Sequence, residues 1–104
     1  MLLLNAFSLN MLAAFPAVVQ VREIPLTRAQ GILAEDFESA VGHADTAAVF
    51  SSVLGLEIPA NRATVALKSG DSAVVGQYRG PRLPEGATTL PAGATIQWLR
   101  VTVS

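Results

Sequence analysis

Only one histidine occurs in this chain, His43, and it follows Gly42 at the start of a run that reads as an amphipathic helix. An imidazole has a reference pKa near ~6.5, so both of its protonation states are accessible at neutral pH. The first turn of a helix also presents free backbone N–H groups and a partial positive charge, which together bind anions. His43 is therefore a candidate proton donor, a candidate phosphate contact or a plain helix-start residue.

Six of the seven cations are arginine, and three of them stand near this candidate or in a loop. Arg62 precedes an expected strand, while Arg79 and Arg82 flank a Gly-Pro step in a loop that also carries Glu85. Guanidinium groups hold phosphate through charge-assisted, often bidentate hydrogen bonds. We expect a phosphate-binding cleft that includes Gly42 and these arginines. The competing interpretation is a solvated loop with a surface ion pair, which is worth little.

Ser8 and Asn10 follow the first expected strand, at the point where the chain reaches the edge of a sheet. Both side chains commonly hydrogen-bond nearby backbone groups in turns. From their spacing alone we favour this turn chemistry over contact with a ligand.

The composition excludes several kinds of site. There is no cysteine, which rules out disulfides, Cys-bound zinc, iron–sulfur clusters and thiolate catalysis. One histidine and eight scattered acids show no metal-ligand spacing, so we expect neither a metal nor a cofactor. The net charge of −1 provides no global positive field for long nucleic acid, so an anionic ligand must be held by a local cluster.

The surface composition predicts a partner. Apolar residues make up 51% of the chain and charged residues only 14%, so a monomer would have few charged residues on its surface. A homodimer is the simplest way to cover the exposed apolar surface. The first twenty residues are apolar but lack a basic segment and are interrupted by Asn, Ser and Pro. We expect no secretion signal, no membrane span and a cytoplasmic location.

The expected fold is α+β, in one domain over residues 1–104, with a mixed sheet of about five strands and two helices against it. Alternation and β-branched residues predict strands at 2–7, 17–24, 63–68, 72–78 and 96–103, the last with one dry face. A Ser-Gly-Asp turn at 69–71 predicts a hairpin, and 36–38 reads as a connector. The expected helices are 28–34, capped by Thr27, and 43–54, ending at Gly55. Their predicted buried residues are Ala29, Ile32 and Leu33 in the first helix, and Ala47, Phe50, Val53 and Leu54 in the second.

Four pieces of the chain resemble the small viral anti-CRISPR ring nucleases that act against type III CRISPR immunity, and their uncharacterised viral relatives. The pieces are the run Leu-Asn-Ala-Phe-Ser-Leu-Asn-Met-Leu at 4–12, Ser-Ala-Val-Gly-His at 39–43 with Thr46, Asn61-Arg62, and Arg-Leu-Pro-Glu-Gly at 82–86. Each piece is weak alone, but they occur in family order and spacing. The sequence departs from the pattern at 87–97, where many relatives carry a longer, partly helical segment.

The resemblance implies a two-fold homodimer that binds cyclic tetra-adenylate across its axis and cuts it without metal. The products would be linear di-adenylates ending in a 2′,3′-cyclic phosphate, which suppresses type III CRISPR signalling in the cytoplasm of the host. It implies that His43 is the general acid and that Arg82 and Glu85 support and position the transition state. It also implies that Ser8 and Asn10 contact the ligand. Two alternatives stay open: a sponge that sequesters a cyclic nucleotide without cutting it, and a structural or protein-binding module.

Overall fold

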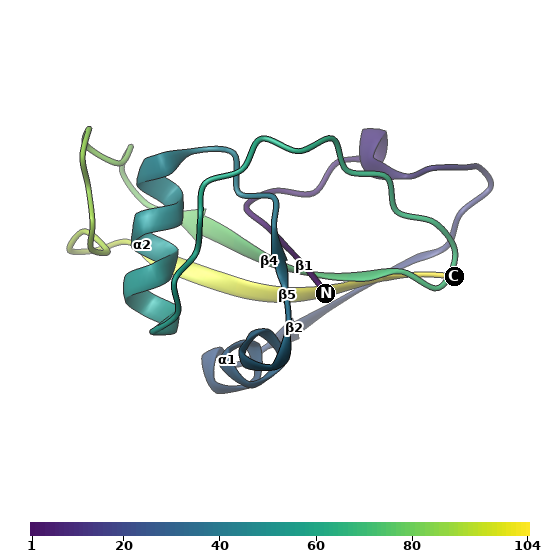
Figure 1. Ribbon diagram of the computed structural model, residues 1–104, viewed down its shortest axis with the longest axis horizontal. Helices are drawn as coiled ribbons and strands as arrows, with labels where there is room; N and C mark the ends of the chain where they lie inside the picture. The colour runs from purple at the N-terminus through teal and green to yellow at the C-terminus, as the bar shows by residue number, and fades with distance from the viewer.

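Five strands form one mixed sheet in the computed structural model, which describes residues 1–104 (Figure 1). The sheet order is β2-β5-β4-β1-β3. β2, β5 and β4 pair antiparallel, whereas β1 runs parallel to both β4 and β3. The expected α+β class and mixed sheet are thus confirmed. The strands are β1 (Leu2–Leu4), β2 (Val19–Ile24), β3 (Glu38–Ser39), β4 (Ser72–Arg79) and β5 (Thr95–Val103).

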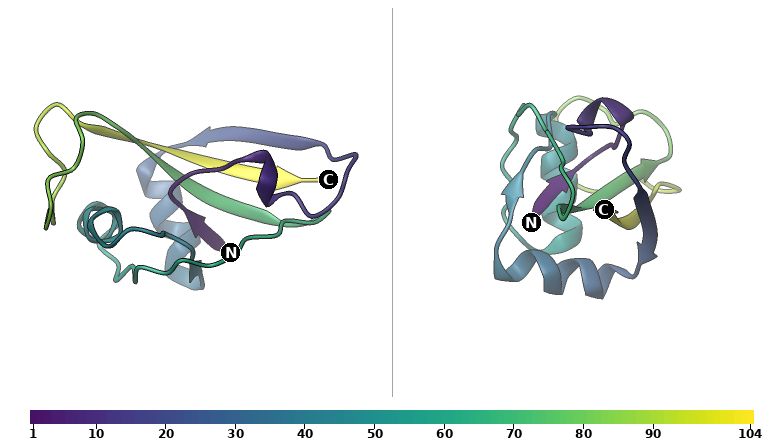
Figure 2. Two further views of the ribbon diagram at one scale, coloured as in Figure 1. Left: turned by 90° about the horizontal axis from the view of Figure 1, so that it is seen from above. Right: turned by 90° about the vertical axis from the view of Figure 1, so that its right-hand side faces the viewer.

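Two helices, α1 (Leu26–Glu35) and α2 (Ala44–Leu54), cover the same face of the sheet (Figures 1 and 2). Their apolar stripes join Leu3, Val74 and Trp98 of the sheet in the largest buried cluster. Gly55 ends α2 in the left-handed conformation, as a helix-stop glycine does. The predicted helix faces are confirmed, with Val49 as an addition and with Ile32 and Val53 only partly buried. The buried helix residues are Ala29, Leu33, Ala47, Val49, Phe50 and Leu54.

The close approach of α2 to the sheet depends on Gly76 in β4. The rings of Phe50 and Trp98 meet over this glycine, with centroids 5.2 Å apart and an interplanar angle of 59°. A Cβ at position 76 would lie 2.6 Å from Phe50 and 2.7 Å from Trp98, closer than real side chains approach. Glycine is therefore the residue that lets the aromatic pair settle on the sheet.

Irregular chain covers part of the opposite face of the sheet. A stretch after β1, which includes the short 3₁₀ helix η1 (Leu9–Met11), packs beside the connection between α2 and β4. Leu67 holds the two segments together, because its N–H donates to the Met11 carbonyl at 2.6 Å and its carbonyl accepts from Ala13 N–H at 2.8 Å. Leu12 and Leu67 are buried there with Val103 of β5.

The strand predicted at 63–68 is wrong. This segment makes only the isolated Leu12–Leu67 bridge. β4 already pairs with β1 on one side and β5 on the other, so it offers no free edge for a hairpin partner. The turn itself is present, because Asp71 N–H donates to the Lys68 carbonyl at 2.9 Å and Gly70 adopts a positive φ of 95°. It leads from irregular chain into β4 instead of joining two strands.

Three other boundaries differ from expectation. β1 stops at Leu4, and Phe7 leaves the strand to pack over the sheet. The expected connector at 36–38 contributes β3, which pairs with β1. Thr27 lies inside α1 instead of capping it, because the helix begins directly after Pro25, whose backbone is extended.

β5 is not buried on one face alone. Trp98, 4% exposed, is buried under the helices, whereas Val101 and Val103, 1% and 3% exposed, are buried on the opposite side. Each face of the strand is therefore covered over part of its length. Arg100 and Thr102, which share the helix-covered side with Trp98, are only partly buried.

Candidate functional site

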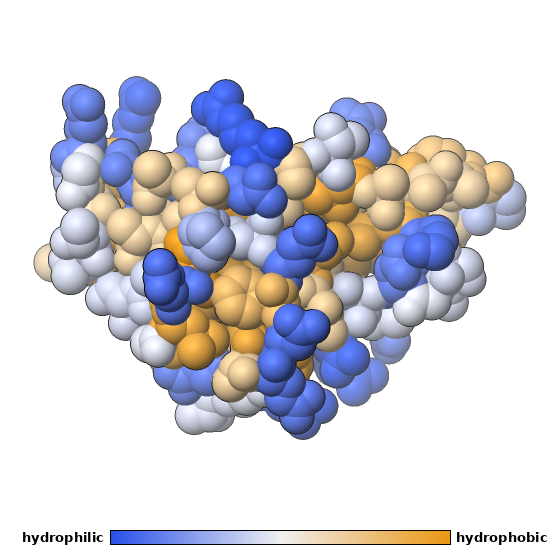
Figure 3. Space-filling view, in the orientation of Figure 1, coloured by the Kyte–Doolittle hydropathy of each residue, from blue (hydrophilic) through white to orange (hydrophobic).

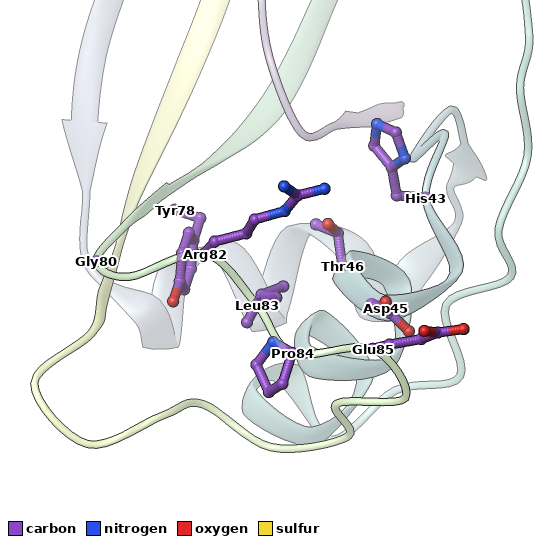
Figure 4. Close-up of a pocket in the computed structure, with 9 residues that line it drawn as sticks. All are labelled: His43, Asp45, Thr46, Tyr78, Gly80, Arg82, Leu83, Pro84 and Glu85. Atoms are coloured by element: carbon purple, nitrogen blue, oxygen red, sulfur yellow. The ribbon is translucent and has the colours of Figure 1, made fainter.

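An open groove of about 850 Å³ lies between the start of α2 and the loop that follows β4 (Figure 4). Three residues predicted from the sequence to act in catalysis converge on it: His43, Arg82 and Glu85. Most of the residues that line the groove are polar or charged. Its other lining residues are Asp45, Thr46, Tyr78, Gly80, Leu83 and Pro84.

His43 is the N-cap residue of α2. Its backbone is extended, with φ −123° and ψ 131°, and its carbonyl accepts the first helical hydrogen bond from Ala47 N–H at 2.9 Å. Its side chain makes no capping hydrogen bond and is exposed toward the groove. His43 is thus an exposed helix-start residue with a free imidazole, and its role as a proton donor or phosphate contact stays a prediction.

The chain that leads into His43 is held by the connection after α2. Asn61 donates its side-chain amide to the Ser39 carbonyl and its backbone N–H to the Val41 carbonyl, both at 2.7 Å. Arg62 Nε donates to the Gly42 carbonyl at 3.1 Å. Gly42 and Arg62, predicted as ligand contacts, thus lie beside the groove without lining it. In this structure these hydrogen bonds fix the backbone that presents His43.

The loop after β4 is tied to α2 by Asp45. Its carboxylate accepts a hydrogen bond from Gly86 N–H at 3.1 Å, which joins residues 41 positions apart. At the other end of the loop, Tyr78 donates its hydroxyl to the Pro81 carbonyl. Gly80 lies so close to Ala94 that a Cβ there would be 2.7 Å from the alanine Cβ. The loop that carries Arg82 and Glu85 is therefore anchored at both ends.

Arg82 and Glu85 point in different directions. Figure 4 shows the Arg82 guanidinium reaching across the groove toward the side of His43, with Thr46 beneath, whereas Glu85 extends away from Arg82. They form no ion pair, since the only ion pair of the chain joins Lys68 and Asp71. The expected surface ion pair is therefore absent, whereas both side chains are exposed, as expected for a solvated loop.

The groove carries a net negative formal charge when His43 is counted as neutral. Arg82 is its one permanent cation, set against the carboxylates of Asp45 and Glu85. An anion in the groove would be met by the Arg82 guanidinium and the His43 imidazole. No cluster of three histidine or acidic side chains is placed to hold a metal ion.

Ser8, Asn10 and Arg79 do not line the groove of a single chain. Ser8 is the N-cap residue of η1 without a side-chain capping bond, and Asn10 lies within η1, both exposed. Arg79 instead donates to the side-chain carbonyl of Gln97 at 3.3 Å. Their roles as ligand contacts stay predictions.

The sequence analysis missed Asp45 and Tyr78 as site residues. Asp45 lies in the first turn of α2, and nothing local in the sequence indicates its partner 41 residues away. Tyr78 is the only tyrosine, and strand alternation from Val74 and Gly76 puts it on the helix-covered face. This strand alternation at the end of β4 was the sequence signal that could have identified Tyr78 as a site residue.

Two viral proteins are similar to this chain. Uncharacterized protein 26 of Sulfolobus islandicus filamentous virus (isolate Iceland/Hveragerdi) is 34% identical over 70 residues, a match that spans 66% of this chain and 59% of that relative. B116 of Sulfolobus turreted icosahedral virus (STIV) has a similar structure, with a TM-score of 0.82, 26% identity and 97% of each chain covered. The sequence pattern of the STIV B116-like family matches residues 1–93. The chain therefore belongs to the STIV B116-like family.

Proposed function

We propose that this protein is a metal-independent ring nuclease that binds and cleaves cyclic tetra-adenylate. The observation that carries the proposal is the convergence of His43, Arg82 and Glu85, from two separate parts of the chain, on one open groove. Membership of a family with viral relatives agrees with a role in suppressing type III CRISPR signalling in the host cytoplasm.

The reaction needs no protein nucleophile, because each ribose of the ring carries a 2′-hydroxyl beside its own phosphorus. Attack by this oxygen forms the O2′–P bond and breaks the P–O5′ bond, leaving a 2′,3′-cyclic phosphate and a 5′-hydroxyl. In the proposal the protonated imidazole of His43 donates to the leaving O5′, the 2′-hydroxyl proton passes to water, and Arg82 stabilises the charge on the phosphorane. Glu85 positions the ring in line for attack.

Two copies related by a two-fold axis would complete the site. A two-fold dimer presents two copies of His43 and Arg82 to a ring that can share the symmetry, together with two copies of the Asp45 and Glu85 carboxylates. A partner could cover the exposed apolar side chains, since Leu9, Phe15, Val18 and Val21 are 53–69% exposed. Figure 3 shows apolar surface at the right-hand end, over the loop that follows η1, whereas α2 and the loop after β4 lie at the left-hand end (Figure 1). This apolar surface therefore supports a partner, but it does not bring two copies of the groove together.

The test is a time course with cyclic tetra-adenylate in large excess over protein, in the presence of EDTA and analysed by chromatography. We expect linear di-adenylate to accumulate over many turnovers. A ring that stays intact with the wild-type protein contradicts the proposal.

A second candidate is a sponge that sequesters the ring without cutting it. The observation that favours it is that no residue of 86–97 lines the groove, which therefore has no cover from that segment in a single chain. Imprecise positioning spares binding but loses in-line attack. A sponge protects a receptor of the messenger in proportion to its own concentration, whereas a nuclease does so at far lower amounts.

A further inference from the structure

Three of the six arginines line a second groove, of about 380 Å³, where β2, β5 and the start of α1 meet. They are Arg22, Arg28 and Arg100, one from each element, with Gln20 and Thr102 beside them. The lining contains no acidic residue. This arginine groove is separate from the groove at His43, because the two share no lining residue.

The arrangement of the arginines is unfavourable in the free protein. Arg22 and Arg100 are direct partners in the antiparallel β2–β5 pair, where Cβ atoms lie about 5 Å apart and like charges destabilise the sheet. Arg28 stands in the first turn of α1, where the helix dipole also opposes a positive charge. α1 has no acidic residue in that turn to compensate.

No group of the protein neutralises these three guanidiniums. None of them donates a hydrogen bond within the chain, unlike Arg62 and Arg79, which bond to a carbonyl and to a glutamine. The only ion pair of the chain joins Lys68 and Asp71. Donors from three rigid elements therefore remain available to a ligand.

We propose that the arginine groove binds a polyphosphate anion, as the free ion or as the di- or triphosphate of a nucleotide. Planar guanidinium forks match phosphate oxygens in bidentate geometry, and two adjacent phosphates use donors that come from different elements. The volume suits such an ion, since small-ligand sites run from roughly 300 to 1,000 Å³. This site is independent of the proposed nuclease function.

The experiment is a titration of the ¹⁵N-labelled protein with pyrophosphate, following the side-chain Nε–H signals of arginine by NMR. We expect saturable shifts at Arg22, Arg28 and Arg100, and an affinity that falls as salt is added. The absence of saturable shifts at these three residues up to about 10 mM pyrophosphate overturns the proposal.

Matched variants locate the binding. Arg100→Gln should weaken pyrophosphate binding about tenfold or more, because a charge-assisted bidentate contact is lost. Lys68→Gln removes the same charge from a residue that does not line the groove and should change the affinity less than about twofold. If Arg82→Gln abolishes binding while Arg100→Gln does not, pyrophosphate binds at the His43 groove and the proposal fails.

A stability readout distinguishes a folding defect from a binding defect. Relief of the Arg22–Arg100 repulsion should raise the melting temperature of unliganded Arg100→Gln by roughly 1–3 °C. Pyrophosphate should then raise the melting temperature of the wild type and not that of the variant. Equal affinities for pyrophosphate and ATP support recognition of the phosphates alone, and tighter ATP binding supports a nucleotide. An equal rise in both proteins overturns the proposal.

Discussion

The groove at His43 and the arginine groove are built on different kinds of scaffold. His43 stands at a helix start and Arg82 on a loop, and one hydrogen bond from Gly86 to Asp45 ties the two together. Arg22 and Arg100 stand instead on paired strands, fixed by the sheet itself. The first groove mixes a cation with carboxylates, and the second contains arginines without any. A site shared by a helix start and a tethered loop suits a substrate that changes during a reaction, whereas a site on paired strands suits a fixed anion.

Removal of the imidazole should give the largest difference in effect between the two grooves. If cyclic tetra-adenylate is the substrate, His43→Ala should lower the single-turnover rate about 10²–10⁴-fold, because the leaving oxygen loses its proton donor. Binding of the ring should persist, and pyrophosphate binding at the arginine groove should not change. His43→Gln is the control, since it keeps a hydrogen-bonding side chain but cannot act as an acid at neutral pH. A full rate in either variant removes His43 from the chemistry.

Substitution of Gly76 tests the core that supports both grooves. Gly76→Ala puts a methyl group against the rings of Phe50 and Trp98 and should cost about 1–3 kcal/mol in the free energy of unfolding. Gly31→Ala is the matched control, because a Cβ there meets nothing within 4 Å. In the middle of α1 it should stabilise the protein by about 0.5–1 kcal/mol. Denaturant melts of the two variants that shift in the same direction would contradict this account.

Release of the loop should affect only the groove at His43. Asp45→Ala removes the acceptor of the Gly86 N–H, so Arg82 loses its fixed position and ring cleavage should slow about tenfold. Asp45→Asn retains a side-chain oxygen that can accept this bond, so it should slow cleavage less. Pyrophosphate affinity should be the same in both variants. Equal rates for the alanine and asparagine variants would show that the bond does not position the loop.

The turn at Asp71, which lines neither groove, should give the smallest effect. The backbone N–H of Lys68 donates to the Asp71 carboxylate and lowers its pKa below the ordinary value of 3.8, with the Lys68 charge adding to the effect. A pKa lowered by folding stabilises the protein above the unfolded-state value, and this stabilisation is lost as the pH falls through the folded-state value. Asp71→Asn should therefore slightly lower the melting temperature at pH 7, and the difference should shrink as the pH falls below 3.8. A difference that persists unchanged at the lower pH would contradict the assignment.

Local sequence signals predicted α2 and the residues it buries. The spacing of Ala47, Phe50 and Leu54 and the stop at Gly55 are properties of neighbouring residues, and the structure confirms them. The strand predicted at 63–68 failed because a strand also needs a free partner edge, which β4 does not offer. Partner availability depends on the whole sheet and not on the segment itself.

Both grooves depend on contacts that the sequence alone does not show. His43 was visible as a lone imidazole before a helix, but its anchor to the Arg82 loop joins residues 41 apart and carries no local signal. The Arg22–Arg100 pairing likewise becomes visible only when the strand register is known. Chemistry-bearing residue types could therefore be predicted from the sequence, whereas their assembly required the fold.

The most direct test of the central claim is identification of the products by ³¹P NMR, after the wild-type protein has acted on excess cyclic tetra-adenylate in EDTA. The account predicts a 2′,3′-cyclic phosphate on linear di-adenylate, with loss of the signal of the ring. A ring signal that remains unchanged, or products that carry a 5′-phosphate, would contradict it.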